Sequence, residues 1–304
     1  MDAVLIPTFN RPEFLTLALD CILHSDIPKG MTFVFQIDYG HDPDVVKVID
    51  RFDNNLVKKY GQNAPKIVKS FTLKSKFPSK SKLSYNILTG YRNAVGYSDR
   101  YVYMIEDDVM IGESFWQFHE WVHDHSDTAK AFGEGGLFCS IGSKNPNREV
   151  KQTNDVKLWY TSSGDYASVG VCFHKDVLKD IVLPHANEKY FSFPARYIKN
   201  TIGLQGISAM YPEQAGLIRR LQIKSGLPIA FPYVPRAFHS GFYGKNRKGY
   251  EIKGTLEDRI DAVRDIAFNI VRLRETVKER WVRDSEPCSL EAYDERLMFD
   301  QHYS

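Results

Sequence analysis

The stretch YVYMIEDDVMIGESFW, residues 101–116, decides how the chain folds. Its first five residues are apolar or aromatic and predict a buried strand, and three carboxylates follow at once. Adjacent anions repel one another, and burying even one of them is costly unless a positive charge lies nearby. No lysine or arginine occurs between Tyr101 and Trp116. The missing charge is therefore a distant side chain or a bound cation.

Strands and helices alternate around this stretch. Strands are expected at 3–7, 31–38, 66–73 and 101–105, and helices at about 11–23, 43–60, 83–97 and 112–125. Asn10 is the expected N-cap of the first helix, with Pro12 in its first turn and Glu13 closing a capping box. The strands are continuously apolar, which is typical of a parallel sheet covered by helices on both faces. The fold class is therefore α/β, Rossmann-like, with a mostly parallel sheet.

The pattern loosens after residue 130. Short strands are expected within 137–142, 159–164 and 166–174, and helices at 174–182 and 256–282. No repeat and no clear linker separates the two halves. We expect one domain over 1–250, with halves 1–110 and 111–250, followed by a C-terminal helical extension, 251–304.

Composition excludes several classes of protein. No apolar run approaches the length of a membrane span, and the N-terminus lacks the features of a secretory signal. The four cysteines lie far apart with no C-x-x-C pair, which is typical of reduced cytoplasmic thiols and not of a disulfide framework or a zinc site. We expect a cytoplasmic protein that does not contact a membrane, in a bacterial or phage-infected cell.

The net charge is only +2, but it is unevenly spread. Residues 54–98 carry nine lysines and arginines and no acid, and a second basic group includes Arg219, Arg220 and Arg236. Such asymmetry favours a polyanionic partner. The alternative is a solvated lysine-rich face. Tyr85, Tyr91 and Tyr97 lie in the first basic segment and are candidate stacking partners for a nucleic acid base.

Polar side chains follow several of the expected strands. Thr8 and Arg11 follow the first, Asp38 follows the second, and the three carboxylates follow the fourth. In open α/β sheets, ligands bind beyond the carboxyl ends of the strands. If the chain stays extended past Ile105, Glu106 and Asp108 project to one side and Asp107 to the other.

Oxygen ligands at this edge suit a hard cation, Mn²⁺ or Mg²⁺, held partly by substrate phosphates. The alternative is an acidic turn whose carboxylates interact with the positive end of the following helix. The polar residues at the neighbouring strand ends favour the site.

Four segments carry a resemblance to a known family. They are VLIPTFNRPEFLTLALDCIL (4–23), FQIDYGHDPDVVKVI (35–49), YRNAVGYSDRYVYMIEDDVMIGESFWQF (91–118), and YPEQAGLIRR with PYVPRAFHSG (211–220 and 232–241). Their order resembles metal-dependent glycosyltransferases of the GT-A fold, in particular the N-acetylglucosaminyltransferase I family. The resemblance extends to the base-modifying glucosyltransferases of kinetoplastids and phages.

The resemblance implies a role for each matching residue. Arg11, Asp38 and Asp107 would bind the nucleotide part of a UDP-sugar donor, with Thr8 nearby, and Glu106 would contact the sugar. Asp108 would ligate the metal, and His239 would lie near the metal or the diphosphate. Glu213 would be the general base of an inverting transfer. Alternatively, Glu213 is a first-turn helix acid, and His239 a hydrogen-bonded loop histidine.

The acceptor expected from the basic segments is a 5-hydroxymethylpyrimidine base, such as 5-hydroxymethylcytosine, in double-stranded DNA. Its phosphates would meet the basic side chains Lys74, Lys76, Lys80, Lys82, Lys245 and Arg247. The first alternative is a cell-envelope or capsule glycan. A nucleotidyltransferase is disfavoured because IPTFNRPEF contains no glycine. A non-catalytic DNA-binding protein is a further alternative.

Overall fold

The computed structural model describes residues 1–125, 136–143, 159–162, 166–203, 213–232, 235–244, 247–248 and 252–266; at 79–80, 125, 159–162, 243–244 and 247–248 it describes the backbone alone. A mixed sheet with strand order β3-β2-β1-β4-β8-β6-β9-β7 forms its centre. The strands are β1 (Ala3–Thr8), β2 (Thr32–Ile37), β3 (Lys66–Phe71), β4 (Tyr101–Met104), β6 (Cys139–Ile141), β7 (Trp159–Ser162), β8 (Val171–His174) and β9 (Ile229–Pro232).

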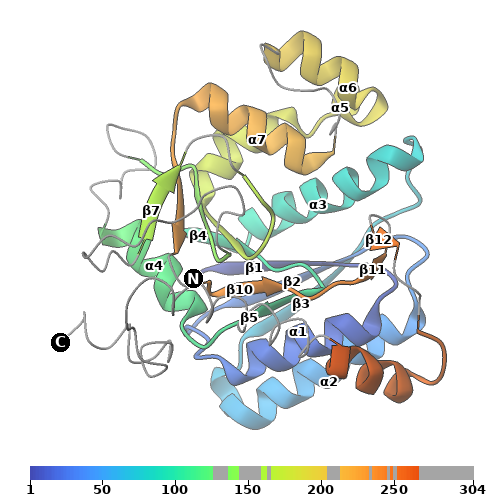
Figure 1. Cartoon of the computed structure of the whole chain (residues 1–304). Coiled ribbons are helices and arrows are strands. Elements are labelled where there is room, and N and C mark those ends of the chain that lie inside the picture. The colour runs from blue at the N-terminus through green and yellow to red at the C-terminus, as the bar shows by residue number, and fades with distance from the viewer. Residues whose placement is uncertain are drawn as a thin grey trace, which may run out of the picture.

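Helices cover this sheet (Figure 1). The α-helices are α1 (Pro12–His24), α2 (Pro43–Tyr60), α3 (Ser79–Val95), α4 (Phe115–His125), α5 (Glu188–Ser192), α6 (Pro194–Tyr197) and α7 (Gln214–Ser225). Shorter or wider helical segments are η1 (Gly61–Asn63), η2 (Val177–Val182), η3 (Leu183–His185) and η4 (Ile198–Gly203). Residues 256–266 are also helical. No helix within the described ranges has the length and apolar character that a bilayer crossing requires.

The N-terminal half of the sheet is parallel. Strand β1 pairs with β2 and with β4, and β2 pairs with β3, all in parallel register. Beyond β4 the direction changes, because β8 is antiparallel to both β4 and β6. The carboxyl ends of β1 to β4 therefore meet at one edge, which we call the carboxyl edge. The predicted α/β class with a mostly parallel, helix-flanked sheet is confirmed.

The two faces of the sheet are buried by different helices. Alternate residues of β1 show this: Leu5 packs in the core that contains α3 and α7, whereas Val4 and Ile6 pack in the core that contains α1 and α2. Figure 1 shows α3 and α7 on one side of the strands and α1 and α2 on the other. Burial on both faces explains why the strand sequences are apolar throughout.

Helix α3 crosses the sheet very closely. A Cβ at Gly90 would lie 2.5 Å from Cδ1 of Leu5 and 3.1 Å from Cβ of Gln36. Glycine is therefore required at this position of the helix, despite its cost in helix propensity.

The start of α1 differs from the expectation. Arg11, and not Asn10, is the N-cap residue, and its side chain makes no capping hydrogen bond. Glu13 is buried and lies 3.2 Å from Nη1 of Arg259 instead of closing a capping box. The physical reason is tertiary: Arg259 lies in the helical segment 256–266, far along the chain, and brings a full positive charge to this carboxylate.

Two small two-stranded sheets lie outside the central sheet, and β5, between the carboxylates and α4, belongs to one of them. Strand β5 (Val109–Ile111) pairs antiparallel with β10 (Ala237–His239), and β11 (Tyr243–Gly244) pairs with β12 (Arg247–Lys248). The helix predicted at 112–125 is confirmed as α4 from Phe115 onward, whereas strand β5 was not predicted. Three residues are too few for strand periodicity to be read without knowing the partner.

The cysteines are unpaired where the structure describes them. Cys139 and Cys172 are buried thiols and Cys21 is partly buried, whereas Cys288 lies outside the described residues.

Candidate active site

The three carboxylates lie in a turn at the carboxyl edge. Strand β4 ends at Met104, and the backbone N–H of Val109 donates to the carbonyl of Glu106 at 3.0 Å. The turn places the side chains of Asp107 and Asp108 on the same side, where both contact the guanidinium of Arg11. The expected alternation of side chains is therefore wrong, because it required an extended backbone past Ile105.

The distant positive charge is Arg11. Its Nη1 donates to Oδ2 of Asp108 at 2.7 Å, and its Nη2 and Nε both face the carboxylate of Asp107. The guanidinium also lies over the ring of Phe14, 5.5 Å from its centroid. All three charged side chains are mostly buried, so this is a desolvated ion-pair network in which arginine holds two carboxylates at once.

His239 reaches the same carboxylate from another part of the chain. Pairing of β5 with β10 sets Val109 opposite His239, and Nε2 of His239 lies 3.4 Å from Oδ2 of Asp108. Ser240 donates to the carbonyl of Asp108 through its backbone N–H at 2.8 Å and its hydroxyl at 3.0 Å. The segment after β10 thus fixes the backbone of the carboxylate turn.

Gly241 is the position with the closest approach to the cluster. A Cβ there would lie 2.1 Å from Oδ2 of Asp108. Only glycine lets this segment lie against the carboxylate. The sequence reasoning singled out the histidine of the FHSG segment and missed the glycine, whose signal is its position two residues after His239.

Burial of the acids changes their protonation. Burial, together with the charge of Asp108, raises the pKa of Glu106 to about 8, while a hydrogen bond with Ser168 opposes the rise. Burial also raises the pKa of Asp107 to about 6, although Arg11 opposes it. One arginine is therefore insufficient to offset three carboxylates, and the cluster favours a further positive charge.

The donor set suits a hard divalent cation. Oδ1 of Asp108 is buried and has no hydrogen-bond partner within the described part of the chain, and His239 offers a second ligand atom beside Oδ2. No three His, Cys, Asp or Glu side chains among the described residues enclose a metal by themselves. Mg²⁺ and Mn²⁺ sites of nucleotide-dependent enzymes need no such cage, since one or two carboxylates and the substrate phosphates suffice. The residues present therefore fit Mn²⁺ or Mg²⁺.

The neighbouring strand ends supply polar groups to the same edge. The backbone N–H of Asp38 donates to the carbonyl of Thr8 at 2.9 Å, so the two residues are held together. Burial raises the pKa of Asp38, while the N–H of Tyr39 and the charge of Lys82 oppose the rise. The hydroxyl of Thr8 is buried and lacks a hydrogen-bond partner in the described ranges. The side chains of Tyr39 and Phe71 are more than half exposed at this edge.

Glu213 lies at the start of α7. It is the N-cap residue of that helix, and the N–H of the following Gln214 donates to Oγ of Ser84 in α3 at 2.9 Å. The position of Glu213 agrees with the alternative that it is an acid at the start of a helix. The role of Glu213 as the general base stays a prediction.

The first basic segment does not form one surface. Lys58 and Lys59 end α2 and Lys66 begins β3, so these three lie at the edge opposite the carboxylates. Lys74, Lys76 and Lys82 follow β3 or lie in the first turn of α3, at the carboxyl edge; Lys76 is paired with Glu188 at 2.7 Å. The side chain of Lys80, all of Lys245 and the side chain of Arg247 lie outside the described residues.

Several residues of the predicted polyanion surface are internal. Arg220 and Arg236 are buried; Nη1 of Arg220 donates to the carbonyl of Gly216 at 2.9 Å. Tyr91 is fully buried against Phe173, so it cannot stack on a base. These interpretations are wrong because sequence alone does not separate an aromatic or basic residue of the core from one on the surface.

Comparison with known proteins gives only distant likenesses. No family model and no curated protein matches the chain. Among solved structures, residues 1–349 of S. aureus TarS are 14% identical with a TM-score of 0.45, over 76% of this chain and 58% of that one. The mannosyltransferase PcManGT from Pyrobaculum calidifontis, in complex with GDP-Man and Mn²⁺, is 14% identical with a TM-score of 0.39, over 77% and 57%.

The glycosyltransferase GlyE of Streptococcus pneumoniae is 7% identical with a TM-score of 0.43, over 88% of this chain and 63% of that one. The chain spans less than two thirds of the length of each of these proteins. Because identities and scores are low, the assignment of the fold rests on the sheet topology itself.

Proposed function

We propose that the protein is a metal-dependent glycosyltransferase that uses a nucleotide-sugar donor, in the first instance a UDP-sugar. The observation that carries this proposal is the cluster of Glu106, Asp107 and Asp108 at the carboxyl edge, where Arg11 and His239 meet it. The four sequence segments that resemble GT-A glycosyltransferases contain all of these residues, and the likeness of the motifs supports the same reading.

Each residue of the site would have a separate role. Asp108 and His239 would hold the cation, which when bound supplies Lewis-acid stabilisation of the departing nucleoside diphosphate. Asp38 lies at the end of β2 to accept hydrogen bonds from the nucleoside. Arg11 and Asp107 would orient the donor beside it. Tyr39 and Phe71, exposed at the same edge, offer faces for the nucleobase.

Glu106 would contact the sugar. Glu213 would take the proton from the acceptor hydroxyl in a single inverting displacement, so no covalent sugar–enzyme intermediate is needed.

We propose two candidate acceptors. A 5-hydroxymethylpyrimidine in DNA is supported by Lys74, Lys76 and Lys82, which lie at the carboxyl edge. A glycan of the cell envelope or capsule is supported by a separate hollow on α5 and α6, described below. Both share every donor-side residue.

Donor hydrolysis tests the common part of the proposal. The protein is incubated with Mn²⁺ and a panel of UDP- and GDP-sugars without acceptor, and released nucleoside diphosphate is measured. We expect slow release that a chelator abolishes and that Asp108→Asn lowers at least about a hundredfold, because the substitution removes a charge that the cation requires. Absence of release with every donor, or equal release by the variant, would contradict the proposal.

The acceptor is tested separately. Hydroxymethylated duplex is incubated with the active donor, and its digested nucleosides are analysed by mass. A mass gain of one sugar per modified base identifies a DNA acceptor; no gain with an active donor directs the search to glycans.

A further inference from the structure

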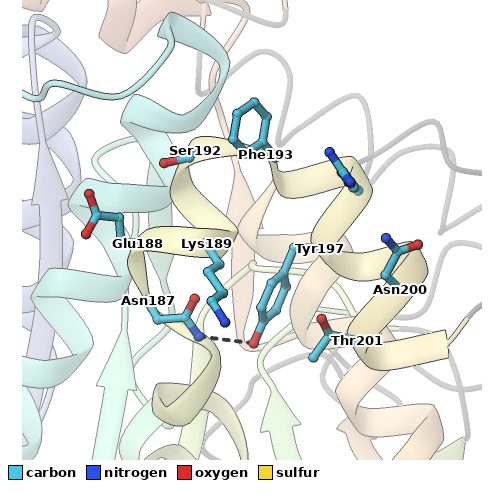
Figure 2. A pocket seen from close by; sticks show the side chains of 9 residues that line it. Asn187, Glu188, Lys189, Ser192, Phe193, Tyr197, Asn200 and Thr201 are labelled. Carbon is cyan, nitrogen blue, oxygen red and sulfur yellow. Dashed lines mark hydrogen bonds between the residues drawn. The ribbon is translucent and has the colours of Figure 1, made fainter.

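A hollow of about 740 Å³ lies on the segment formed by α5, α6 and η4, outside the carboxylate cluster. Figure 2 shows the side chains that line it. Those used below are Asn187, Lys189, Phe193, Arg196, Asn200 and Thr201. Pockets of this size suit a small molecule or a short oligosaccharide.

One wall of the hollow is held in place by hydrogen bonds. Asn187 caps α5, because its Oδ1 accepts from the N–H of Tyr190 at 3.1 Å. Its Nδ2 donates to the hydroxyl of Tyr197 at 3.1 Å, the bond drawn dashed in Figure 2, and Nδ1 of His185 lies 2.9 Å from the same hydroxyl. A wall fixed before binding costs little conformational entropy when a ligand arrives.

The charge of the hollow is positive. Lys189 and Arg196 line it, and neither has an ion-pair partner within the described part of the chain. The acid in the lining, Glu188, already binds Lys76 at 2.7 Å. Two cations in one concave site favour a ligand that carries a carboxylate or a phosphate.

The rim combines an aromatic face with neutral polar groups. Phe193 is the residue between α5 and α6, and 64% of its surface is exposed. Asn200 and Thr201 contribute an amide and a hydroxyl to the same lining. A sugar ring presents an apolar C–H face for an aromatic ring and hydroxyls for amides, so this set of groups matches a saccharide.

A nucleic acid is a poorer match. Proteins that follow a nucleic acid backbone use a basic groove several nucleotides long. Here the hollow is lined by two cations, Lys189 and Arg196, beside the aromatic ring of Phe193.

The hollow is connected to the predicted base. The hydroxyl of Tyr190, in α5, lies 3.4 Å from Oγ of Ser84, and this Oγ accepts from the N–H of Gln214, next to Glu213. The helix that carries Lys189 is thus joined through α3 to the start of α7.

We propose that this hollow binds an acidic saccharide, one that carries a carboxylate or a phosphate. Its identification as the acceptor rests on the proposed glycosyl transfer, whereas the binding itself does not.

Saturation-transfer NMR and calorimetry test the binding without any donor or metal. The probes are a hyaluronan tetrasaccharide, a sialic acid tetrasaccharide, a teichoic-type glycerol phosphate tetramer bearing sugars, neutral chitotetraose, inorganic phosphate and a 12-base-pair DNA duplex. We expect at least one acidic saccharide to bind. Phe193→Ala and Arg196→Ala should each weaken it about tenfold, whereas Lys199→Ala, which removes an exposed charge of η4 that does not line the hollow, should leave it unchanged.

Four outcomes overturn the proposal. They are no binding of any acidic saccharide, equal weakening by Lys199→Ala, phosphate binding as tightly as the saccharides, and DNA displacing the saccharide through Phe193 and Arg196. Folding of each variant is checked by thermal unfolding, and Phe193→Tyr keeps an aromatic face as a positive control. Donor hydrolysis is measured in parallel. Hydrolysis that persists in Phe193→Ala while binding is lost separates failure of this site from failure of the proposed function.

Discussion

At the scale of single residues, the site is governed by one imbalance of charge. Arg11 faces Asp107 and Asp108 together, and Glu106 lies buried beside them. Each of these charged side chains would be costly to bury without the others, because a buried charge without a partner is unfavourable. The arginine therefore acts as the resident counter-charge of a pair of acids that would otherwise repel one another.

Removing that counter-charge should make the fold depend on metal. Arg11→Ala removes the cation from Asp107 and leaves Asp108 with His239 alone, and we expect the free energy of unfolding to fall by about 3 to 5 kcal/mol without metal. Mn²⁺ should restore more of the melting temperature in the variant than in the parent protein, because it replaces the lost charge. Thermal unfolding with and without Mn²⁺ measures both.

The matched control is Arg100→Ala, which removes an arginine paired with Asp124 at the surface. Arg100→Ala should lower the free energy of unfolding by less than about 1 kcal/mol, and Mn²⁺ should not raise the melting temperature of this variant more than that of the parent protein. Equal responses to Mn²⁺ in both variants would sink this account of Arg11.

At the scale of elements, distant segments complete the site. Strand β10 brings His239 to Asp108, and the helical segment 256–266 brings Arg259 to the starts of α1 and α2. Nη2 of Arg259 lies 3.1 Å from Asp44, and Nη1 lies 3.4 Å from Asp42. The N-terminal ends of two helices at the carboxyl edge are thereby tied to one arginine.

Arg259→Ala should loosen this edge. We expect a loss of about 2 to 3 kcal/mol in the free energy of unfolding, since the arginine bonds charged and partly buried groups. Urea unfolding measures the loss, and hydrogen exchange should quicken at the first turns of α1 and α2. Arg264→Ala, which breaks a solvent-exposed pair with Asp261, should change stability by less than about 0.5 kcal/mol. Identical effects of the two substitutions would refute the role given to Arg259.

Helix α4 contributes a pH-sensitive contact. His119 and His123 are buried and lie 2.6 Å and 3.0 Å from Oγ of Ser140. Burial lowers the pKa of His123 to about 4 and lowers that of His119 well below its usual value. The folded state therefore binds fewer protons than the unfolded state between about pH 6.5 and pH 4.

Stability should consequently be complete above about pH 6.5 and fall as the pH decreases, by about 1.4 kcal/mol per pH unit for each histidine. His123→Gln should remove one such contribution from the slope. Urea unfolding of both proteins at several pH values in this range measures the difference, in which the carboxylates common to both cancel. Parallel slopes would show that His123 is not held neutral by the fold.

At the scale of the whole molecule, the sheet separates charges that are neighbours in the sequence. Lys58 and Lys59 lie at one edge, and Lys74 and Lys82 at the other, because β3 carries the chain from edge to edge. Only the second pair lies on the side of the carboxylate cluster.

DNA binding at the carboxyl edge should therefore depend on Lys74 and Lys82 and not on Lys58 and Lys59. If duplex DNA binds at the carboxyl edge, Lys74→Ala with Lys82→Ala should reduce the slope of log affinity against log salt by about 2. Lys58→Ala with Lys59→Ala removes the same charge from the opposite edge and should leave the slope nearly unchanged. Fluorescence anisotropy at a series of salt concentrations measures both, and equal loss in the two pairs would mean that binding has no defined face.

The sequence by itself determined the helices and strands of the first half and the edge at which Arg11, Asp38 and the carboxylates gather. It could do so because apolar runs and helical periodicity are local, and because parallel strands bring their carboxyl ends together whatever their order. Only the tertiary structure decided that Arg11 is the missing cation, that Gly241 lies against Asp108, and that Arg259 replaces a capping box. Each of these contacts joins residues far apart in the chain, and their geometry depends on how the elements pack, which no local pattern encodes.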